Sequence, residues 1–178
     1  NIKFIVVRNN NDLKKFDYKI KNAKKKNNII ACLIEQGTIK QTSKNSDKDL
    51  FKFNKEVFLK NLLLKLNNKY KIISSTGFNS RELMYVRKKY NIRGSNDFYI
   101  VGGMGHTSSV SLGYALNNKY KTICIDGDGS FLMHLGSIKT LGTFAKSNLK
   151  YILINNGSHD SVGGQSTFSN LMDIKSFS

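Results

Sequence analysis

The sequence predicts an α/β fold, in which a parallel β-sheet is flanked by helices. Two observations support this prediction. Strand-like and helix-like stretches alternate along the 178 residues, which is the pattern of parallel strands joined by crossover helices. Residues 29–34 are a short and almost wholly apolar run, as expected of a strand buried on both faces. A hydrophobic content of 39% is enough for one such domain with part of another.

The first part of the chain contains one helix-like and one strand-like stretch. Residues 12–26 are rich in lysine and predict a helix, and residues 29–34 predict a buried strand. Residues 41–52 are polar, which indicates a linker. We therefore expect residues 1–45 to be the end of one domain with its linker. Residues 46–178 are expected to form a second domain, truncated at its C-terminus, because the sequence stops without an obvious terminal element.

The second domain is expected to begin with a helix. Asn54 is its predicted cap, and apolar residues recur from there through Leu66. A later helix is expected to be capped by Asn79 or Ser80. The predicted strands are 71–75, 98–101, 122–125 and 150–154, and the predicted helices between them are 80–90, 108–116 and 131–145.

The net charge of +17 raises the question of nucleic-acid binding. Only four of the 29 basic residues are arginine, and the lysines are mixed with asparagine and isoleucine. This composition is typical of proteins from an A/T-rich genome more than of a designed basic surface. We expect non-specific attraction to polyanions and no specific nucleic-acid partner.

The cysteines and the apolar stretches indicate a cytoplasmic protein. Cys32 and Cys124 lie in apolar runs, where a thiol is usually a small buried hydrophobic group, and neither has metal-site spacing. Apolar runs stay well short of the roughly 18 residues of a membrane-spanning helix. We therefore expect a reducing compartment and no membrane partner.

Two polar loops follow predicted neighbouring strands. Residues 126–130 (Asp-Gly-Asp-Gly-Ser) come after the strand at 122–125, and residues 155–158 (Asn-Asn-Gly-Ser) come after the strand at 150–154. The single helix between them returns the chain to a neighbouring parallel strand. Both loops are therefore expected side by side at the carboxyl edge of the sheet, where α/β folds bind ligands.

The side chains of these loops suit a metal-diphosphate site. Asp128 supplies an anionic oxygen, Asn156 a neutral oxygen, and a backbone carbonyl just beyond it a third, which is a suitable set for Mg²⁺. Gly127 and Gly129 allow the backbone to approach phosphates. Ser130 and the amides after it can donate hydrogen bonds to that negative charge.

Gly-Asp-Gly-Ser followed at this interval by Asn-Asn resembles the signature of thiamine diphosphate (ThDP) dependent enzymes. The resemblance implies ThDP and Mg²⁺ as cofactors, with Asp128, Asn156 and the Ser158 carbonyl as metal ligands. Asp126 has no role in that pattern, and we interpret it as a turn residue. An ordinary Gly-Asp-Gly turn is the alternative interpretation.

Two further loops resemble cofactor-binding segments of this family. Residues 101–109 lack the lysine of a Walker motif and the spacing of a dinucleotide fingerprint, but are similar to the segment that runs beneath ThDP in its decarboxylases. The resemblance implies that the Gly102 carbonyl accepts from the 4′-amino group and that Met104 supports the bent cofactor; core packing is the alternative for Met104. Thr76 and Gly77 are secondary diphosphate candidates, or simply part of a helix-capping turn.

Residues 103–109, 133–134 and 156–165 together are similar to phosphonopyruvate decarboxylases, within a resemblance that covers about 54–170; sulfopyruvate decarboxylases are the alternative. The implied reaction converts the 2-oxoacid phosphonopyruvate to phosphonoacetaldehyde and CO₂. His106 and His159 are then candidate catalytic residues, as proton donors or as imidazolium groups facing the phosphonate, and satisfied surface histidines are the alternative. We expect His134 to be structural and Arg81 to be an exposed helical residue.

The family also uses a glutamate from a separate Pyr domain, usually on a second subunit, and no residue of this sequence matches it. Residues 29–37 resemble the last strand of such a domain, and Glu35 lies in it, whereas the family's glutamate lies well before that strand. We therefore expect a second subunit or a missing N-terminal Pyr domain, within a homo-oligomer. Alone, the chain is expected to bind Mg²⁺-ThDP weakly without turnover.

Overall fold

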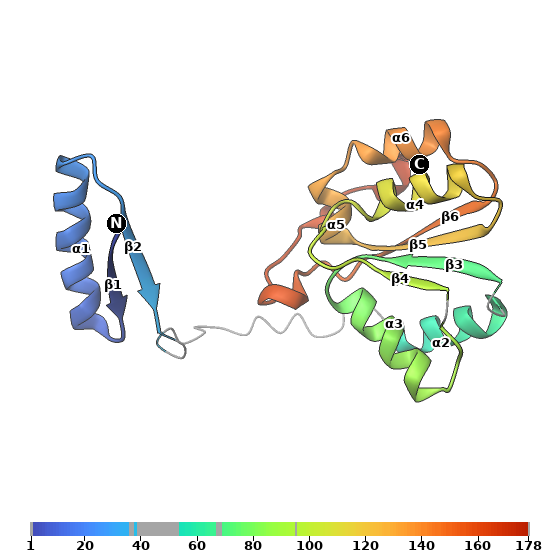
Figure 1. Cartoon of the computed structure of the whole chain (residues 1–178), viewed down its shortest axis with the longest axis horizontal. Helices are drawn as coiled ribbons and strands as arrows, with labels where there is room; N and C mark the ends of the chain where they lie inside the picture. The colour runs from blue at the N-terminus through green and yellow to red at the C-terminus, as the bar shows by residue number, and fades with distance from the viewer. Residues whose placement is uncertain (1, 36–37, 39–53, 67–68, 95, 178) are drawn as a thin grey trace. The chain divides into compact units, whose positions relative to one another are not determined.

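The strands form two separate parallel sheets in the computed structural model (Figure 1). The structure describes residues 2–35, 38, 54–66, 69–94 and 96–177. The chain divides into two compact units, Asn1–Leu50 and Phe51–Ser178. The predicted linker at 41–52 lies outside the described residues, and each unit is described by itself.

The first unit is a small β-α-β arrangement. Strand β1 (Lys3–Val7) pairs in parallel with β2 (Ile30–Ile34), and helix α1 (Asn10–Lys25) joins them. The helix begins where the Asn9 side chain accepts hydrogen bonds from the next backbone amides. The structure confirms the predicted helix and the predicted strand, and it adds β1, which the sequence did not indicate to us. The predicted burial of β2 is wrong, because Leu33 and Ile34 are 50% and 51% exposed.

The second unit is a four-stranded parallel sheet with the strand order β4-β3-β5-β6. From β3 the chain moves outward to β4, then crosses over β3 to reach β5 and continues to β6. The winding direction therefore reverses between β3 and β5, and ligands of open α/β sheets bind at such a point, beyond the carboxyl ends of the strands. The elements in chain order are α2 (Lys55–Leu66), β3 (Tyr70–Ser74), α3 (Phe78–Lys89), β4 (Asp97–Tyr99), α4 (Thr107–Asn117), β5 (Lys121–Gly127), α5 (Asp128–Met133), α6 (Ser137–Phe144), β6 (Leu149–Ile154), and the short 3-10 helices η1 (Asp160–Val162), η2 (Ser169–Leu171) and η3 (Ile174–Phe177).

Helices cover both faces of this sheet, with α2 and α3 on one face and α4, α5 and α6 on the other (Figure 1). Because side chains alternate along a strand, β5 contributes to both cores. Ile123 and Ile125 pack with Leu59 and Leu83 of α2 and α3, whereas Cys124 packs with α4 and α6. Strand β5 is thus buried on both faces, as its apolar sequence predicts.

The predicted helix boundaries are correct at α2 and wrong at two other places. The Asn54 side chain accepts from the Val57 amide at 3.1 Å, which confirms it as a cap. Neither Asn79 nor Ser80 caps α3, since both lie inside the helix and their side chains bond back to Ser75. The predicted helix at 131–145 is two helices, because α5 ends at Met133 and α6 begins only at Ser137.

The cysteines agree in part with the prediction. Cys124 is fully buried, and burial raises the pKa of its thiol, so it packs as an inert hydrophobic group. Cys32 is only half-buried. Within the described ranges, no helix combines the length and the apolar character needed to cross a bilayer.

Glu56 links α2 to the end of α3, and it provides a test of this packing. Its carboxylate accepts from the Lys89 ammonium and the Tyr90 hydroxyl, both at 2.7 Å. These two hydrogen bonds, with that of Lys89 the larger cause, lower the pKa of Glu56. Because the pKa is lower in the folded protein than in the unfolded chain, the ionised carboxylate stabilises the fold at pH values above the unfolded-state pKa. This stabilisation is lost as the pH falls through the folded-state pKa. We expect Glu56→Gln to lower the melting temperature at neutral pH but not near about pH 3. Thermal unfolding of the variant and of the unmutated protein across this pH range measures the effect. The same difference in melting temperature at neutral and at acidic pH would contradict the expectation.

Candidate functional site

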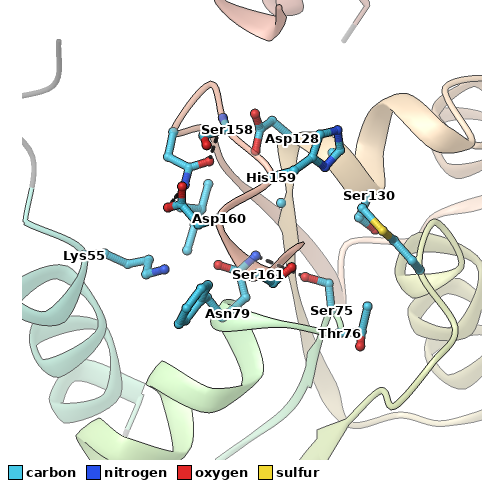
Figure 2. Close-up of a pocket in the computed structure, with 16 residues that line it drawn as sticks. Lys55, Ser75, Thr76, Asn79, Asp128, Ser130, Ser158, His159, Asp160 and Ser161 are labelled. Carbon is cyan, nitrogen blue, oxygen red and sulfur yellow. Dashed lines mark hydrogen bonds between the residues drawn. The ribbon is translucent and has the colours of Figure 1, made fainter. Parts of the chain in front are cut away.

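The carboxyl ends of β3, β5 and β6 border one cavity in the second unit (Figure 2). Its empty space, counted together with the adjoining space open to solvent, is about 470 Å³. It lies at the reversal of the winding direction, as the topology requires. The lining residues are Lys55, Ser75, Thr76, Phe78, Asn79, Met104, Gly127, Asp128, Gly129, Ser130, Ile154, Asn156, Ser158, His159, Asp160 and Ser161.

Most of the predicted site residues are brought together here. The predicted residues that line the cavity are Thr76, Met104, Gly127, Asp128, Gly129, Ser130, Asn156, Ser158 and His159. Three others lie outside the lining. Gly77 precedes α3 with φ +88° and packs against Ser161, and the Gly102 amide donates to the Thr76 hydroxyl at 3.4 Å. His106 is exposed, and its ring centroid lies 4.4 Å from that of His134.

Asp128 is fixed by a loop that arrives from later in the sequence. One carboxylate oxygen, Oδ2, accepts from the Thr167 hydroxyl and from the Ser169 hydroxyl, the latter at 2.9 Å. Among the described residues, no hydrogen bond is made to the other oxygen, Oδ1. Asp128 is 3% exposed. The carboxylate is therefore held in one orientation with one oxygen left for a further partner.

Asn156 is oriented by a neighbouring carboxylate. Its amide nitrogen donates to Asp160 Oδ2 at 2.7 Å, and its oxygen accepts from the Ser158 amide at 3.3 Å. The loop then folds back on itself, and its backbone hydrogen bonds use the Gly157 and His159 carbonyls as acceptors. Within the described part of the chain, the Ser158 carbonyl has no such bond.

These groups fit a hard divalent cation. A carboxylate oxygen, an amide oxygen that still has a lone pair, and an unused backbone carbonyl are the oxygen ligands that Mg²⁺ takes, with water or phosphate oxygens completing six. The bond from Asn156 to Asp160 would hold the amide in place as an outer partner of the metal site. In the described residues there is no cluster of three or more His, Cys, Asp or Glu side chains that could hold a metal, so a site here would depend on neutral oxygen donors.

The junction of β5 and α5 is tightly packed around the two glycines that we expect to approach the phosphates. A Cβ atom at Gly129 would lie 2.5 Å from the His159 ring and 3.1 Å from Met104. A Cβ atom at Gly127 would lie 2.9 Å from the Asn79 side chain. The absence of a Cβ atom at both glycines therefore leaves room for neighbouring side chains. At Gly129, the side chains of His159 and Met104 both pack against the backbone.

Asp126 is not the turn residue that we predicted. It lies in β5, is 1% exposed, and accepts from the Tyr151 hydroxyl of β6 at 3.0 Å. Its other oxygen accepts from the Gly127 amide at 3.0 Å. Burial raises the pKa of the Asp126 carboxyl, and these hydrogen bonds oppose that shift. The carboxyl joins the central strand β5 to the edge strand β6, next to the start of α5, where Asp128 lies.

Several lining residues were missed by the sequence reasoning. They are Lys55, Ser75, Phe78, Asn79, Ile154, Asp160 and Ser161. Asp160 and Ser161 lie in the segment whose resemblance we noted, so an acidic residue four positions after Asn156 was an available signal. Lys55 had none, because only the packing of α2 against α3 brings it to the cavity.

Comparisons with known proteins agree with this geometry. Residues 75–176 match the thiamine pyrophosphate enzyme C-terminal TPP binding domain. Phosphonopyruvate decarboxylase of Streptomyces viridochromogenes is 41% identical over 116 residues, which are 65% of this chain and 28% of that protein. Sulfopyruvate decarboxylase subunit beta of Methanocaldococcus jannaschii is 40% identical over 109 residues, which are 61% of this chain and 55% of that protein.

The matched region covers the cavity almost completely. It contains the loops after β3, β5 and β6, and of the lining residues it omits Lys55. The relatives are matched over about a quarter to about half of their own length. The domain description implies thiamine diphosphate, the same compound as thiamine pyrophosphate, as the cofactor of this domain. The chain belongs to the thiamine pyrophosphate enzyme family and carries its C-terminal TPP binding domain at residues 75–176.

Proposed function

We propose that this chain provides the Mg²⁺-diphosphate half of the active site in an enzyme that decarboxylates phosphonopyruvate to phosphonoacetaldehyde and CO₂. The supporting observation is the arrangement of Asp128, Asn156 and Ser158 around one cavity at the carboxyl edge of the sheet. Phosphonopyruvate decarboxylases from two Streptomyces species, 41% and 40% identical over 116 residues, support the choice of substrate.

Each part of the cavity has a proposed task. When bound, thiamine diphosphate supplies the electron sink that stabilises the carbanion left after CO₂ departs. Asp128, Asn156 and the Ser158 carbonyl hold Mg²⁺ against the diphosphate, with Ser130 and Thr76 as neighbouring polar groups.

Residues next to the proposed metal ligands position the organic part of the cofactor, and one of them supplies a proton. Met104 supports the bent cofactor, with the Gly102 carbonyl as acceptor for its amino group. His159 is the better placed proton donor, because it lines the cavity. His106 would have to act from the exposed edge of the Gly102–His106 loop.

Sulfopyruvate is the second candidate substrate. Sulfopyruvate decarboxylase beta subunits from three archaea are 38–40% identical over 103–109 residues. The matched residues make up 53–55% of the length of each of these subunits. The two substrates differ only in the terminal anion, so the same cavity would serve either one. A beta subunit also implies a partner subunit, which would make the enzyme a two-chain assembly.

The catalytic glutamate is proposed to come from a Pyr domain on that partner or on a longer chain. The first unit would then be the end of such a domain. In support, its two-stranded sheet leaves Phe4 60% and Ile34 51% exposed, as expected if further elements of that domain cover these side chains. A homo-oligomer is the simplest way to pair the two kinds of domain.

Decarboxylation assays with both substrates test this proposal. With ThDP and Mg²⁺, the full-length protein is expected to release CO₂ from phosphonopyruvate faster than from sulfopyruvate, and the 178-residue chain alone is expected to release none. A reversed preference would favour the second substrate. Turnover by the isolated chain would contradict the assignment of the glutamate to another domain or subunit.

A further inference from the structure

Lys55 is a cation at the cavity that the family match does not include. It is the first residue of α2, and the Asn54 cap fixes the start of that helix. Its side chain is 22% exposed. Among the described residues that line the cavity, no other is a lysine or an arginine. A single, largely buried lysine side chain in a cavity proposed to hold a diphosphate requires an explanation.

Glu82 of α3 orients this ammonium. Lys55 Nζ lies 2.7 Å from Glu82 Oε2, and both side chains are about three-quarters buried. Glu82 is not a lining residue, whereas Lys55 is. Because an ammonium has three N–H donors and one faces Glu82, the remaining donors are available to an anion in the cavity. The ion pair therefore positions the Lys55 ammonium group and leaves N–H donors for a ligand.

The charges around the cavity make this cation important for an anionic ligand. Asp128 and Asp160 both contribute carboxyl groups to the lining. A diphosphate brings further negative charge, and a divalent cation can offset only part of the total. In a largely buried site an ammonium group interacts with phosphate oxygens more strongly than it would in bulk water.

The position of Lys55 indicates which phosphate it contacts. Figure 2 shows Lys55 and Ser130 on opposite sides of the cavity. Ser130 Oγ accepts from the Gly105 amide at 3.1 Å, so that side adjoins the loop proposed to lie beneath the organic part of the cofactor. The Lys55 side is therefore the end that the outer phosphate would reach.

We propose that Lys55 binds the terminal phosphate of the cofactor and makes the site selective for diphosphate over monophosphate. This inference rests on the proposed cofactor site and goes beyond it, because it assigns a binding residue outside the matched region. It concerns ground-state binding only, and no step of the reaction enters its test.

Binding measurements on the 178-residue chain test the inference. In the presence of Mg²⁺, calorimetric titration with thiamine diphosphate, thiamine monophosphate, pyrophosphate and phosphate gives four dissociation constants. We expect Lys55→Met to weaken thiamine diphosphate and pyrophosphate binding by about 10–100-fold, the range for a lost hydrogen bond to a charged group. Binding of thiamine monophosphate and phosphate is expected to change little.

Three further variants separate anion binding from a structural role. Glu82→Gln removes the same ion pair but leaves the ammonium, so we expect equal or tighter diphosphate binding. Lys65→Met makes the same chemical change at an exposed position of α2 and is expected to have no effect. Lys55→Arg keeps the charge and is expected to retain most of the affinity, which gives a folded comparison if Lys55→Met unfolds.

The outcomes distinguish this inference from the proposed function. Equal losses in Lys55→Met and Glu82→Gln would show that only the ion pair between α2 and α3 matters, and would overturn the inference. Equal weakening of monophosphate and diphosphate would overturn the terminal-phosphate assignment. If the unmutated chain binds thiamine diphosphate and Lys55→Met binds it equally well, the inference fails and the cofactor site stands. No binding by the unmutated chain would contradict both.

Discussion

Replacing Asp128 with alanine is expected to weaken Mg²⁺-dependent binding of thiamine diphosphate by roughly 100-fold or more, because loss of an outer partner of a metal ligand alone costs about 10–100-fold. The carboxylate is buried, and two hydroxyl groups orient it. At a ligand concentration about 100 times the dissociation constant, binding adds about 2.7 kcal/mol to the free energy of unfolding. The variant should lose most of this, as thermal unfolding with and without cofactor would measure.

Two comparison variants make the Asp128 experiment specific. Asn156→Ala removes a second proposed ligand from an exposed position, so it should lose the cofactor-induced shift without much change in the ligand-free protein. Asp17→Ala removes an exposed charge from α1 and should keep the full shift. If Asp128→Ala and Asn156→Ala both retain that shift, the proposed metal ligands are wrong.

Replacing Arg87 with methionine is expected to lower the free energy of unfolding by about 3–5 kcal/mol, the usual cost of leaving a buried charge without its partner. Arg87 of α3 makes two hydrogen bonds to Asp97 of β4, at 2.8 and 2.7 Å, and a third to the Arg93 carbonyl. The Asp97 side chain is fully buried. Tyr99 also donates to Asp97, and burial raises the pKa of that hydroxyl, which keeps it a donor. Denaturant unfolding would measure the change.

Arg81 of the same helix provides the matched control. It is an exposed arginine, as predicted, that packs over the Phe78 ring, so Arg81→Met should change stability by less than about 1 kcal/mol. The double variant Arg87→Met with Asp97→Leu should be destabilised by less than the sum of the two single changes. The reason is that both charges have been removed, so neither is left buried without its partner. Strict additivity would contradict the assignment of this pair as the connection between α3 and β4.

The elements that were predicted well have local signals. Strands β3, β5 and β6 are apolar runs bounded by polar residues, and α2 has its own asparagine cap. The errors occur where local signals compete. Asn79 and Ser80 are good capping residues by type, but Gly77, with φ +88°, begins the helix earlier and releases both side chains to Ser75.

The cavity itself was predictable only in part. Asp128 and Asn156 follow adjacent parallel strands, and the single helical crossover between those strands was enough to predict that the two residues lie near each other. The close contact of His159 with Gly129, and the meeting of His106 with His134, depend on how separate loops pack. No spacing in the sequence specifies either contact.

By itself, the sequence determined the alternation of strands and helices, the placement of two polar segments at the carboxyl ends of β5 and β6, and the resemblance that led to the family. It did not show that the first of these segments is the end of β5 and the start of α5 instead of a loop. These features are encoded within short stretches, where side-chain periodicity and turn residues act on the local backbone. The tertiary structure alone decided that Asp126 is a buried strand residue, that Thr167 and Ser169 fix the Asp128 carboxylate, and that Lys55 reaches the cavity. Each of these depends on residues far apart in the chain, and only the packing of helices and loops on a finished sheet brings such residues together.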